Sequence, residues 1–338
     1  MSEQKIFFSK EDLIRHIEKF SPKNIFLVHG KNFNRLSLSK SLNIFPTTHF
    51  TNFKPNPLIE SVEDGVKVFN ENKCDMIIAV GGGSAIDVAK CVKLNAAPDT
   101  YFIAAPTTAG TGSESTRFAV VYKDGNKQSI TDLRIIPDAI YFDTEPIKIL
   151  PPYQRKATLL DSFSHAAESY WSINATEASR AFAKEALRII VALQEKYFAE
   201  KTNDAENISL LYASYLAGKA INISETTAGH AMSYKLTNLF GISHGHAAAL
   251  CNAKLWQFMR ESDAVKELSE IIGEKTFQKL LIDGELIYPL KNERETDFNS
   301  TLEFLTRSVN PIRLKNFPVS LPEDVIRKIY REILVGEV

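Results

Sequence analysis

Hydrophobic residues in the first 150 positions fall into short apolar runs separated by amphipathic stretches. Apolar runs of this length, bounded by turn residues, predict buried strands, here over residues 24–30, 47–53, 74–83, 101–108 and 138–143. Two stretches between them, 56–73 and 84–96, have the spacing of amphipathic helices. This alternation predicts βαβ units and a largely parallel sheet. A further pair of runs within 118–130, with Asp124 and Gly125 at its centre, predicts a β-hairpin.

The pattern changes after Pro151 and Pro152. Long stretches rich in Ala and Leu, nearly free of Gly and Pro, predict helices over residues 153–172, 176–198 and 205–224, and we expect helices beyond them. A double proline is a natural start for a helix, because proline is tolerated in the first turn. The sequence therefore predicts an α/β domain over residues 1–151 and an all-α domain over residues 152–338. A cleft between two such domains is the expected place for an active site.

Composition excludes several classes of protein. The 40 basic and 41 acidic residues nearly balance, so nothing indicates a nucleic-acid partner. Three widely spaced cysteines, Cys74, Cys91 and Cys251, form no CxxC pair and indicate neither a disulfide framework nor a thiolate metal site. The sequence has neither a signal-peptide pattern at its start nor an apolar stretch of the ~20 residues that a membrane span needs. We therefore expect a cytoplasmic protein with no membrane partner.

Two polar loops follow successive predicted strands of the first half. In "MIIAVGGGSAIDVAK" a glycine-rich turn joins a strand to a helix, and its free N–H groups suit an anion, although a tight turn would also explain it; it consists of Gly81, Gly82, Gly83 and Ser84. In "PTTAGTGSESTR" hydroxyl side chains alternate with glycine; they are Thr107, Thr108, Thr111 and Ser113. Two such loops at the ends of neighbouring strands predict a Rossmann-like dinucleotide site. Asp87 either orients the first loop or is a solvated acid of the first helical turn.

Four candidate metal ligands lie in the second half. Asp161 and His165 are four residues apart in a predicted helix, so their side chains leave the same face. His230 lies in another helix, and His244 follows after a break at Gly241. A single histidine on an apolar helix is more often a core residue, but three imidazoles with one carboxylate suit a divalent ion such as Fe(II), Zn(II) or Co(II). We interpret the neighbouring His246 as a residue that does not ligate the ion.

Four stretches occur in an order that resembles the motif series of the iron-dependent alcohol dehydrogenase family: "GGGSAIDVAK", "PTTAGTGSE", "DSFSHAAE" and "GHAMSYKLTNLFGISHG". The resemblance extends from about residue 24 to about residue 256. It implies an N-terminal NAD(P)-binding domain, a helical domain that holds one metal ion, usually iron, and a homodimer. Matched motif to motif, the implied ligands are Asp161, His165, His230 and His244. The glycine-rich loop with Ser84 and Asp87 would hold the pyrophosphate, and Thr107, Thr108 and Ser113 would line the cofactor site.

The chain departs from the family pattern at three places. Many members have a further histidine four residues after the third ligand, where this chain has Tyr234, and a phenol is a poor base at neutral pH. Members that prefer NAD often have an acid just after the first strand. Here Gly30 and Lys31 leave space and a positive charge for the 2′-phosphate of NADPH. The tail beyond Trp256 does not align.

The resemblance implies hydride transfer between a nicotinamide and the carbonyl carbon of a small aldehyde, polarised by the metal. Proton delivery is expected from water or through Tyr234 or His246. The stretches "SYWSINATEASRAFA" and "HAMSYKLTNLFGISHGHAAAL" look most like the subgroup that reduces phosphonoacetaldehyde to 2-hydroxyethylphosphonate. An anionic substrate needs a cation, for which Arg117 and Lys235 are the candidates, unless they are simply paired or solvated.

Three alternative functions stay open. The first is oxidation or reduction of unfunctionalised short alcohols, diols and their aldehydes. The second is a lyase similar to dehydroquinate synthase, although the helix around Asp161 lacks the dense Lys and Arg that such a pocket needs. The third is a metal-stabilised nucleotide-binding module without catalysis.

Overall fold

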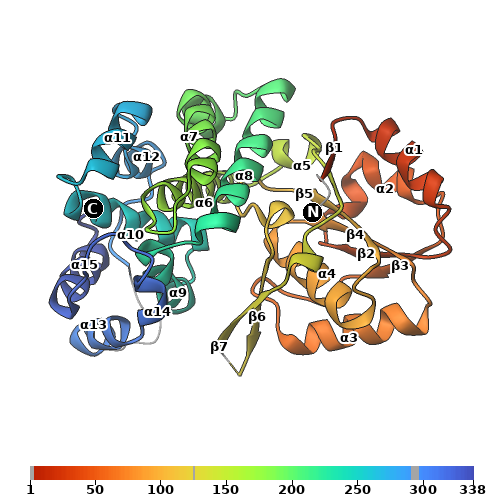
Figure 1. Cartoon of the computed structure of the whole chain (residues 1–338), viewed down its shortest axis with the longest axis horizontal. Helices are drawn as coiled ribbons and strands as arrows, with labels where there is room; N and C mark the ends of the chain where they lie inside the picture. The colour runs from red at the N-terminus through yellow and green to blue at the C-terminus, as the bar shows by residue number, and fades with distance from the viewer. Residues whose placement is uncertain (1–3, 125, 291–296) are drawn as a thin grey trace. The chain divides into compact units, whose positions relative to one another are not determined.

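A six-stranded parallel sheet forms the centre of the α/β part of the chain (Figure 1). The computed structural model describes residues 4–124, 126–290 and 297–338. The strands follow the order β1-β8-β5-β4-β2-β3, with bounds β1 Lys5–Phe7, β2 Ile25–His29, β3 Thr47–Phe50, β4 Met76–Gly81, β5 Tyr101–Pro106 and β8 Ala139–Tyr141. The five strands predicted from the sequence are confirmed, and β1 joins them by pairing with β8.

Helices cover both faces of this sheet, which explains why β2 and β4 are buried along their whole length. Alternate strand residues point to opposite faces, so Phe26 and Val28 belong to one core cluster and Ile25 and Leu27 to another. The first cluster includes residues of α3 (Ile59–Glu71) and α4 (Gly83–Ala96), and the second includes residues of α1 (Lys10–Phe20) and α2 (Ser37–Leu42). The sheet with its helices is the doubly covered architecture that places ligands at the carboxyl ends of the strands.

The predicted hairpin is present as β6 (Phe118–Lys123) and β7 (Asn126–Thr131), which pair in antiparallel register. Asp124 has a φ of 51°, the left-handed conformation that the turn needs. Gly125, the other predicted turn residue, lies outside the described residues. Three short 3-10 helices and one short α-helix complete this part: η1 (Phe33–Arg35), η2 (Ser113–Ser115), η3 (Leu133–Ile135) and α5 (Glu145–Lys148).

Every helix predicted after the double proline is present. Pro152 is the first residue of α6, as expected from the tolerance of proline in the first helical turn. The helices are α6 Pro152–Trp171, α7 Glu177–Phe198, α8 Asp204–Ser224, α9 Ala228–Phe240, α10 His244–Phe258, α11 Asp263–Ile272, α12 Phe277–Asp283, α13 Phe298–Arg307, α14 Pro311–Leu314 and α15 Glu323–Val335. Helix α6 packs against α7 and α10, and α10 packs against α9. The predicted fold class, α/β followed by all-α, is confirmed.

Internal contacts divide the chain into two units that differ slightly from the predicted domains. The first unit comprises residues 1–150 and 204–215, and the second comprises 151–203 and 216–338. Helix α8 therefore belongs to the first unit through Tyr215 and to the second from Leu216.

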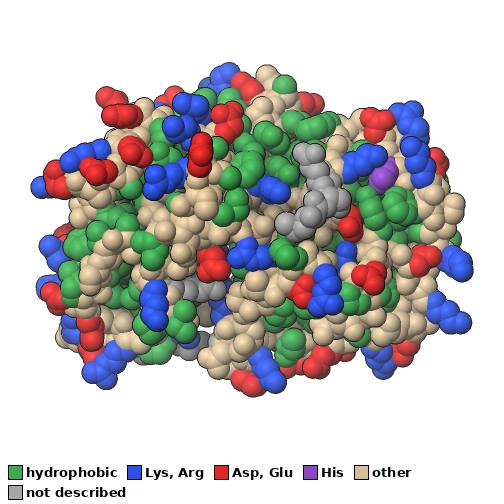
Figure 2. All heavy atoms as spheres, viewed as in Figure 1, with side chains coloured by type: hydrophobic (Ala, Val, Ile, Leu, Met, Phe, Trp, Pro, Cys, Tyr) green, Lys and Arg blue, Asp and Glu red, His purple; other side chains and the backbone are tan. Residues whose placement is uncertain are grey.

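The surface and the cysteines agree with the composition. Lys, Arg, Asp and Glu side chains are interspersed on the face shown in Figure 2, without a large area of one sign. The three cysteines are buried and free. Within the described ranges, no helix is both long and apolar enough to cross a membrane.

Candidate metal centre and nucleotide site

Three ionisable side chains, two carboxylates and one imidazole, lie on one buried face of α6. Asp161, His165 and Glu168 follow one another at intervals of four and three residues, so they lie one above the other on the helix. All three are buried, and α6 carries an almost continuous run of buried residues from Leu159 to Trp171. Buried ionisable groups need partners, because an isolated charge is very unfavourable in a protein interior.

Two glycines let the neighbouring helices come close enough to supply those partners. A Cβ atom on Gly245 would lie 2.1 Å from the carbonyl oxygen of Ala157 and 2.5 Å from Cβ of Asp161. A Cβ atom on Gly229 would lie 1.9 Å from Oδ1 of Asn252. Only glycine fits such approaches. Each glycine is adjacent to one predicted ligand: Gly245 brings His244 of α10 against α6, and Gly229 brings His230 of α9 against α10.

The structure brings Asp161, His230 and His244 together. Their ligand atoms all lie within 4.8 Å of one another, and Oδ1 of Asp161 is 3.6 Å from Nε2 of His230. Ligand atoms around one tetrahedral zinc-sized ion are on the order of 3.4 Å apart, so this spacing suits a divalent metal. The ring of His165 stacks on that of His230 at 4.5 Å between centroids, although its nitrogens lie outside the three-residue group. Its role as fourth ligand therefore stays a prediction.

Glu168 fixes the orientation of His230. Its carboxylate is completely buried and accepts hydrogen bonds from the backbone N–H groups of Thr227 and His230, the Thr227 hydroxyl, the Asn252 amide and His230 Nδ1. The last of these is 2.6 Å long. Because Nδ1 of His230 donates to Glu168, Nε2 is left as the atom that faces Asp161. Carboxylates orient metal-binding histidines in this way.

The side-chain atoms that face one another between Asp161, His230 and His244 are suited to bind a cation. Within the described part of the chain, Oδ1 of Asp161 and Nε2 of His230 are buried without a hydrogen-bond partner. When His230 is neutral, with its proton on Nδ1 toward Glu168, both atoms carry lone pairs and are satisfied by a cation between them. Without a metal ion, a second proton on His230 takes that place. Ser233 Oγ lies 3.4 Å from Nδ1 of His244 and supports the corresponding orientation of the second ring.

The same contacts dominate the electrostatics. Burial acts to raise the pKa of Asp161, but His165, His230 and His244 outweigh it and hold the pKa well below its usual range. Burial likewise opposes ionisation of Glu168, yet His230 and the surrounding donors lower its pKa to about 2. For His230, burial lowers the pKa, but Glu168 and Asp161 raise it to about 10. Both carboxylates are therefore ionised at neutral pH and favour a positive charge between them.

His246 and Tyr234 lie beside the ligands in different environments. Both ring nitrogens of His246 have partners: Nδ1 is 3.2 Å from the Tyr153 hydroxyl and Nε2 is 2.8 Å from the carbonyl oxygen of Leu286. Burial lowers the pKa of His246 to about 4. The half-buried ring of Tyr234 stacks on His244, with 5.6 Å between centroids. Between these two candidates, the Tyr234 ring is thus the one in contact with a predicted ligand.

The two predicted nucleotide loops meet at the carboxyl edge of the sheet. Gly81 ends β4, and its carbonyl oxygen accepts a hydrogen bond of 3.1 Å from the backbone N–H of Thr107, which follows β5. Gly82 precedes the 14-residue helix α4 and provides no side-chain cap. The N–H of Ala85 donates to the Gly82 carbonyl oxygen at 3.1 Å, which leaves the N–H groups of Gly83 and Ser84 to an anion. A Cβ on Gly82 would lie 3.6 Å from Thr108, and one on Gly83 would lie 3.0 Å from Thr111. The loops could therefore hold a dinucleotide pyrophosphate.

Asp87 and Lys90, one helical turn apart on α4, hold the second loop in place. The Ser113 hydroxyl and the Val120 N–H donate to the Asp87 carboxylate at 2.6 and 3.0 Å. Nζ of Lys90, which is fully buried, donates to the carbonyl oxygens of Thr116 and Phe118, each at 2.7 Å. Burial lowers the pKa of this lysine to about 8 despite the opposing charge of Asp87. Both side chains thus bind the protein's own loop.

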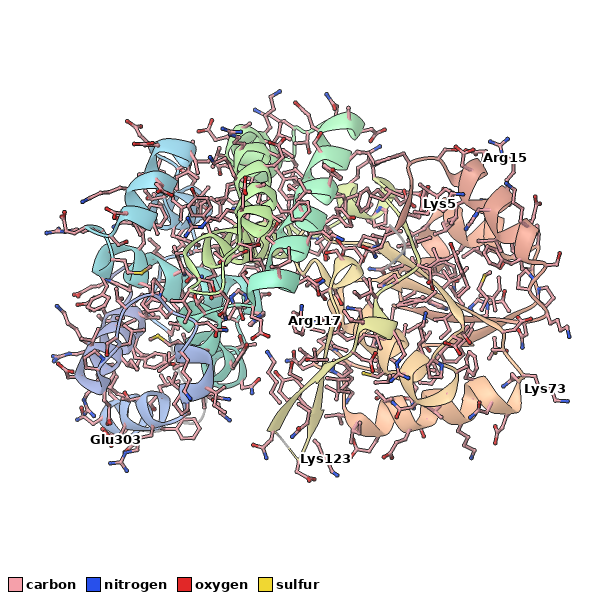
Figure 3. The ribbon with its side chains drawn as sticks, viewed as in Figure 1. Lys5, Arg15, Lys73, Arg117, Lys123 and Glu303 are labelled. Atoms are coloured by element: carbon pink, nitrogen blue, oxygen red, sulfur yellow. The ribbon has the colours of Figure 1, made fainter. Side chains whose placement is uncertain are left out.

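Of the remaining candidates, Gly30, Lys31 and Arg117 lie in the first unit and Lys235 lies in the second. Gly30 and Lys31 follow β2 and are exposed. Arg117 directly precedes β6 (Figure 3), and its guanidinium lies 4.6 Å from the centroid of the Phe118 ring. Lys235 is on α9, with Nζ 5.8 Å from the centroid of the Phe304 ring. Arg117 belongs to the first unit and Lys235 to the second.

Comparison with known proteins decides the family. The profile described as "Iron-containing alcohol dehydrogenase" matches residues 4–144, and the one described as "Fe-containing alcohol dehydrogenase family, C-terminal" matches residues 156–316. The chain belongs to the iron-containing alcohol dehydrogenase family. It is therefore an oxidoreductase of the alcohol dehydrogenase and aldehyde reductase type. The family similarity thus extends to residue 316, so the expectation that the tail beyond Trp256 does not align is wrong.

Individual relatives carry several substrate names. Long-chain-alcohol dehydrogenase 1 of Geobacillus thermodenitrificans is 30% identical, over 86% of this chain and 82% of that protein. Phosphonoacetaldehyde reductase of Streptomyces viridochromogenes is 31% identical, over 57% of this chain and 54% of that protein. The structure of sulfoacetaldehyde reductase from Bifidobacterium kashiwanohense in complex with NAD+ is 26% identical, with a TM-score of 0.88 over 98% of this chain and 97% of that chain.

Glu168 was not among the residues predicted from the sequence, although its spacing from Asp161 and His165 pointed to it. Glu168 lies seven residues after Asp161 and three after His165, a spacing that puts all three on one helical face. The partners that complete its hydrogen bonding, Thr227 and Asn252, lie on other segments and carry no comparable signal in the sequence.

Proposed function

We propose that the enzyme reduces a small aldehyde to its alcohol with NAD(P)H, at a divalent metal held by Asp161, His165, His230 and His244, with Fe(II) as the first candidate and Zn(II) as the second. The observation that carries the proposal is the pair of buried atoms Asp161 Oδ1 and His230 Nε2, which lie 3.6 Å apart and have no hydrogen-bond partner among the described residues. When bound, such an ion acts as a Lewis acid on the substrate oxygen, and the nicotinamide supplies the hydride.

The residues of the chain orient these groups. Glu168 keeps Nε2 of His230 directed to the ion, and the loops after β4 and β5 hold the pyrophosphate. Tyr234, stacked on His244, is the proposed donor of a hydrogen bond to the oxygen that gains negative charge. His246, engaged at both nitrogens, holds Tyr153 in place instead.

The test separates metal binding from folding. His230→Ala should abolish metal binding and aldehyde reduction together, because it removes a ligand, while the circular dichroism of the folded protein is retained. His246→Ala should retain its metal, since both nitrogens of His246 bind elsewhere. Full metal content in His230→Ala by elemental analysis would contradict the assignment. A metal-loaded enzyme that oxidises neither NADPH nor NADH with any short aldehyde would favour the non-catalytic alternative.

We further propose that the substrate carries a phosphonate group, as in phosphonoacetaldehyde. The support is the similarity to phosphonoacetaldehyde reductase and two cations, Arg117 and Lys235, one in each unit. Arginine suits a phosphonate because its planar fork forms two parallel hydrogen bonds. Arg117→Ala should raise KM for phosphonoacetaldehyde about ten-fold or more, with little change for propionaldehyde. Equal effects on both aldehydes, or a wild type that prefers propionaldehyde, would favour unfunctionalised substrates.

We also propose that NADPH is accepted at least as well as NADH. In the sheet His29 pairs with Val80, so Gly30 follows at the level of Gly81 and the start of the phosphate loop. A residue at this point of a dinucleotide-binding sheet faces the adenosine ribose. Gly30 brings no carboxylate to repel a 2′-phosphate. Gly30→Asp should shift kcat/KM toward NADH, and a strong NADH preference in the wild type would refute the proposal.

A further inference from the structure

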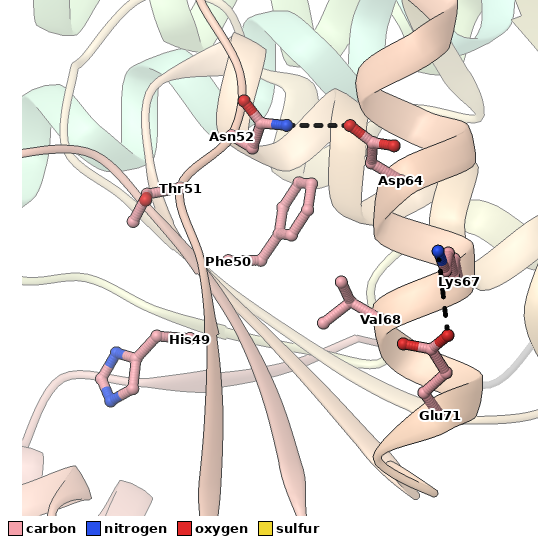
Figure 4. A pocket seen from close by; sticks show the side chains of 8 residues that line it. All are labelled: His49, Phe50, Thr51, Asn52, Asp64, Lys67, Val68 and Glu71. Atoms are coloured by element: carbon pink, nitrogen blue, oxygen red, sulfur yellow. Dashed lines mark hydrogen bonds and ion pairs between the residues drawn. The ribbon is translucent and has the colours of Figure 1, made fainter.

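Two histidines lie in contact at the carboxyl ends of β2 and β3. Nε2 of His29 is 2.9 Å from Nδ1 of His49, and Nδ1 of His29 is 3.0 Å from the carbonyl oxygen of Gly30. His29 is buried, whereas His49 is exposed, and Figure 4 shows the His49 ring turned away from α3. The buried His29 thus contacts both the backbone of Gly30 and the solvent-exposed His49.

The contacts determine which nitrogen carries each proton. A carbonyl oxygen can only accept, so Nδ1 of His29 is the donor to Gly30, and burial lowers the pKa of His29 and favours its neutral form. Nε2 of neutral His29 then accepts, which makes Nδ1 of His49 the donor. Nε2 of His49 remains for a ligand. In an imidazolium both ring nitrogens donate, so His49 in that form offers Nε2–H to a phosphate as a charge-assisted donor and keeps its bond to His29.

We propose that His49, oriented by His29, recognises the 2′-phosphate of NADPH. The inference rests on the proposed use of NADPH and extends it by naming a residue that determines specificity. Its location supports it, because His29 contacts the backbone of Gly30, and Gly30 lies beside the phosphate loop where the adenosine ribose is expected. A buried, hydrogen-bonded partner fixes the ring of His49 and so reduces the entropy lost on binding.

Other charged residues near His49 already interact with one another. A shallow surface pocket of about 400 Å³ is lined by residues of β3, the following loop and α3, among them His49, Asp64, Lys67 and Glu71 (Figure 4). Lys67 lies 3.9 Å from Glu71, and Asp64 accepts a hydrogen bond from Asn52. Two lysines are therefore rivals for an anion in this region: Lys67, with Glu71 as its neighbouring counter-charge, and the exposed Lys31 beside Gly30.

Calorimetric binding of 2′,5′-ADP and 5′-AMP to the full chain tests the proposal without catalysis. In wild type we expect tighter binding of 2′,5′-ADP. In His49→Gln this preference should fall about ten-fold while 5′-AMP affinity is unchanged, as expected for loss of one charge-assisted hydrogen bond. His16→Gln is the matched control, because His16 contacts Tyr101 at the opposite, amino end of β5 and should leave the preference intact. Thermal unfolding confirms that each variant is folded.

The possible results are distinguishable. An undiminished preference in His49→Gln, with the preference lost instead in Lys67→Met or Lys31→Met, would overturn the role of His49 while leaving NADPH use in place. A wild type that binds 5′-AMP as tightly as 2′,5′-ADP would overturn this inference alone, and one that binds 5′-AMP much more tightly would overturn NADPH use as well. Neither result bears on aldehyde reduction, which is measured separately.

Discussion

Replacement of Gly245 by alanine should remove the metal without removing the fold. The new Cβ would lie 2.1 Å from the carbonyl oxygen of Ala157 and 2.5 Å from Cβ of Asp161, whereas ordinary contacts begin at 3.4 Å. Both atoms belong to buried residues in the first half of α6, where close packing leaves little room to yield, so α10 must move by roughly 1 Å to relieve the clash. His244 is adjacent to Gly245 and moves with it, and metal–ligand distances tolerate only about 0.2 Å.

We therefore expect metal affinity to fall by at least about 10- to 100-fold, with a loss of unfolding free energy of about 1–3 kcal/mol from overpacking. Competition with a chelator measures the affinity, and urea unfolding in excess chelator measures the stability of the metal-free chain. Gly30→Ala is the control, since a Cβ there meets nothing within 4 Å. If Gly245→Ala binds metal as tightly as wild type, the close approach of α10 to α6 does not position His244.

Glu168→Gln should weaken metal binding about 10- to 100-fold, because the amide no longer attracts the Nδ1 proton of His230 as a carboxylate does; unchanged affinity in chelator competition would contradict this. His246 has a pKa of about 4 when folded and about 6.5 when unfolded, so the unfolded state binds its proton first as pH falls. Stability of the metal-free chain should therefore decline by about 3 kcal/mol between pH 6.5 and pH 4, and this decline should be smaller in His246→Asn. Lys90→Met should weaken binding of ADP-ribose about ten-fold by releasing the loop at Thr116; equal affinity would show that the loop holds without it.

The sequence predicted most elements because burial and periodicity agree along this chain. The runs that form β2 and β4 are buried on both faces, which produces uninterrupted apolar residues rather than alternation. Strand β1 has only three residues, of which Phe7 alone is buried, so its pattern was too short to predict a strand. The assignment of residues 204–215 to the first unit could not be predicted either, because α8 is one uninterrupted helix in the sequence.

The candidate site, like the fold, was predictable only in those features that depend on local sequence. Spacing within one helix predicted that Asp161 and His165 share a face, and glycine before His244 suggested a turn into a new helix. The contacts that decide the chemistry are between segments far apart in the chain, as Glu168 with Asn252 and Gly245 with Ala157 show. Gly229 and Gly245 can be read in the sequence, but what they do depends on the close approach of other helices. No local sequence pattern encodes that approach.

Charge balance gives the strongest physical argument for a divalent ion at this centre. Asp161 and Glu168 are both buried and both ionised, and imidazoles supply the charges that lower their pKa values. In the metal-free chain His230 carries a proton, since its pKa is raised to about 10, and this supplies one positive charge against two negative ones. A divalent cation with neutral histidines balances the two carboxylates completely. Binding must then displace the His230 proton, so metal affinity should rise with pH below about 10, and calorimetry in buffers of different ionisation enthalpy should detect about one proton released per ion. Metal binding without proton release would mean that His230 is already neutral before the ion binds. The imidazole between the two carboxylates would then not be an imidazolium.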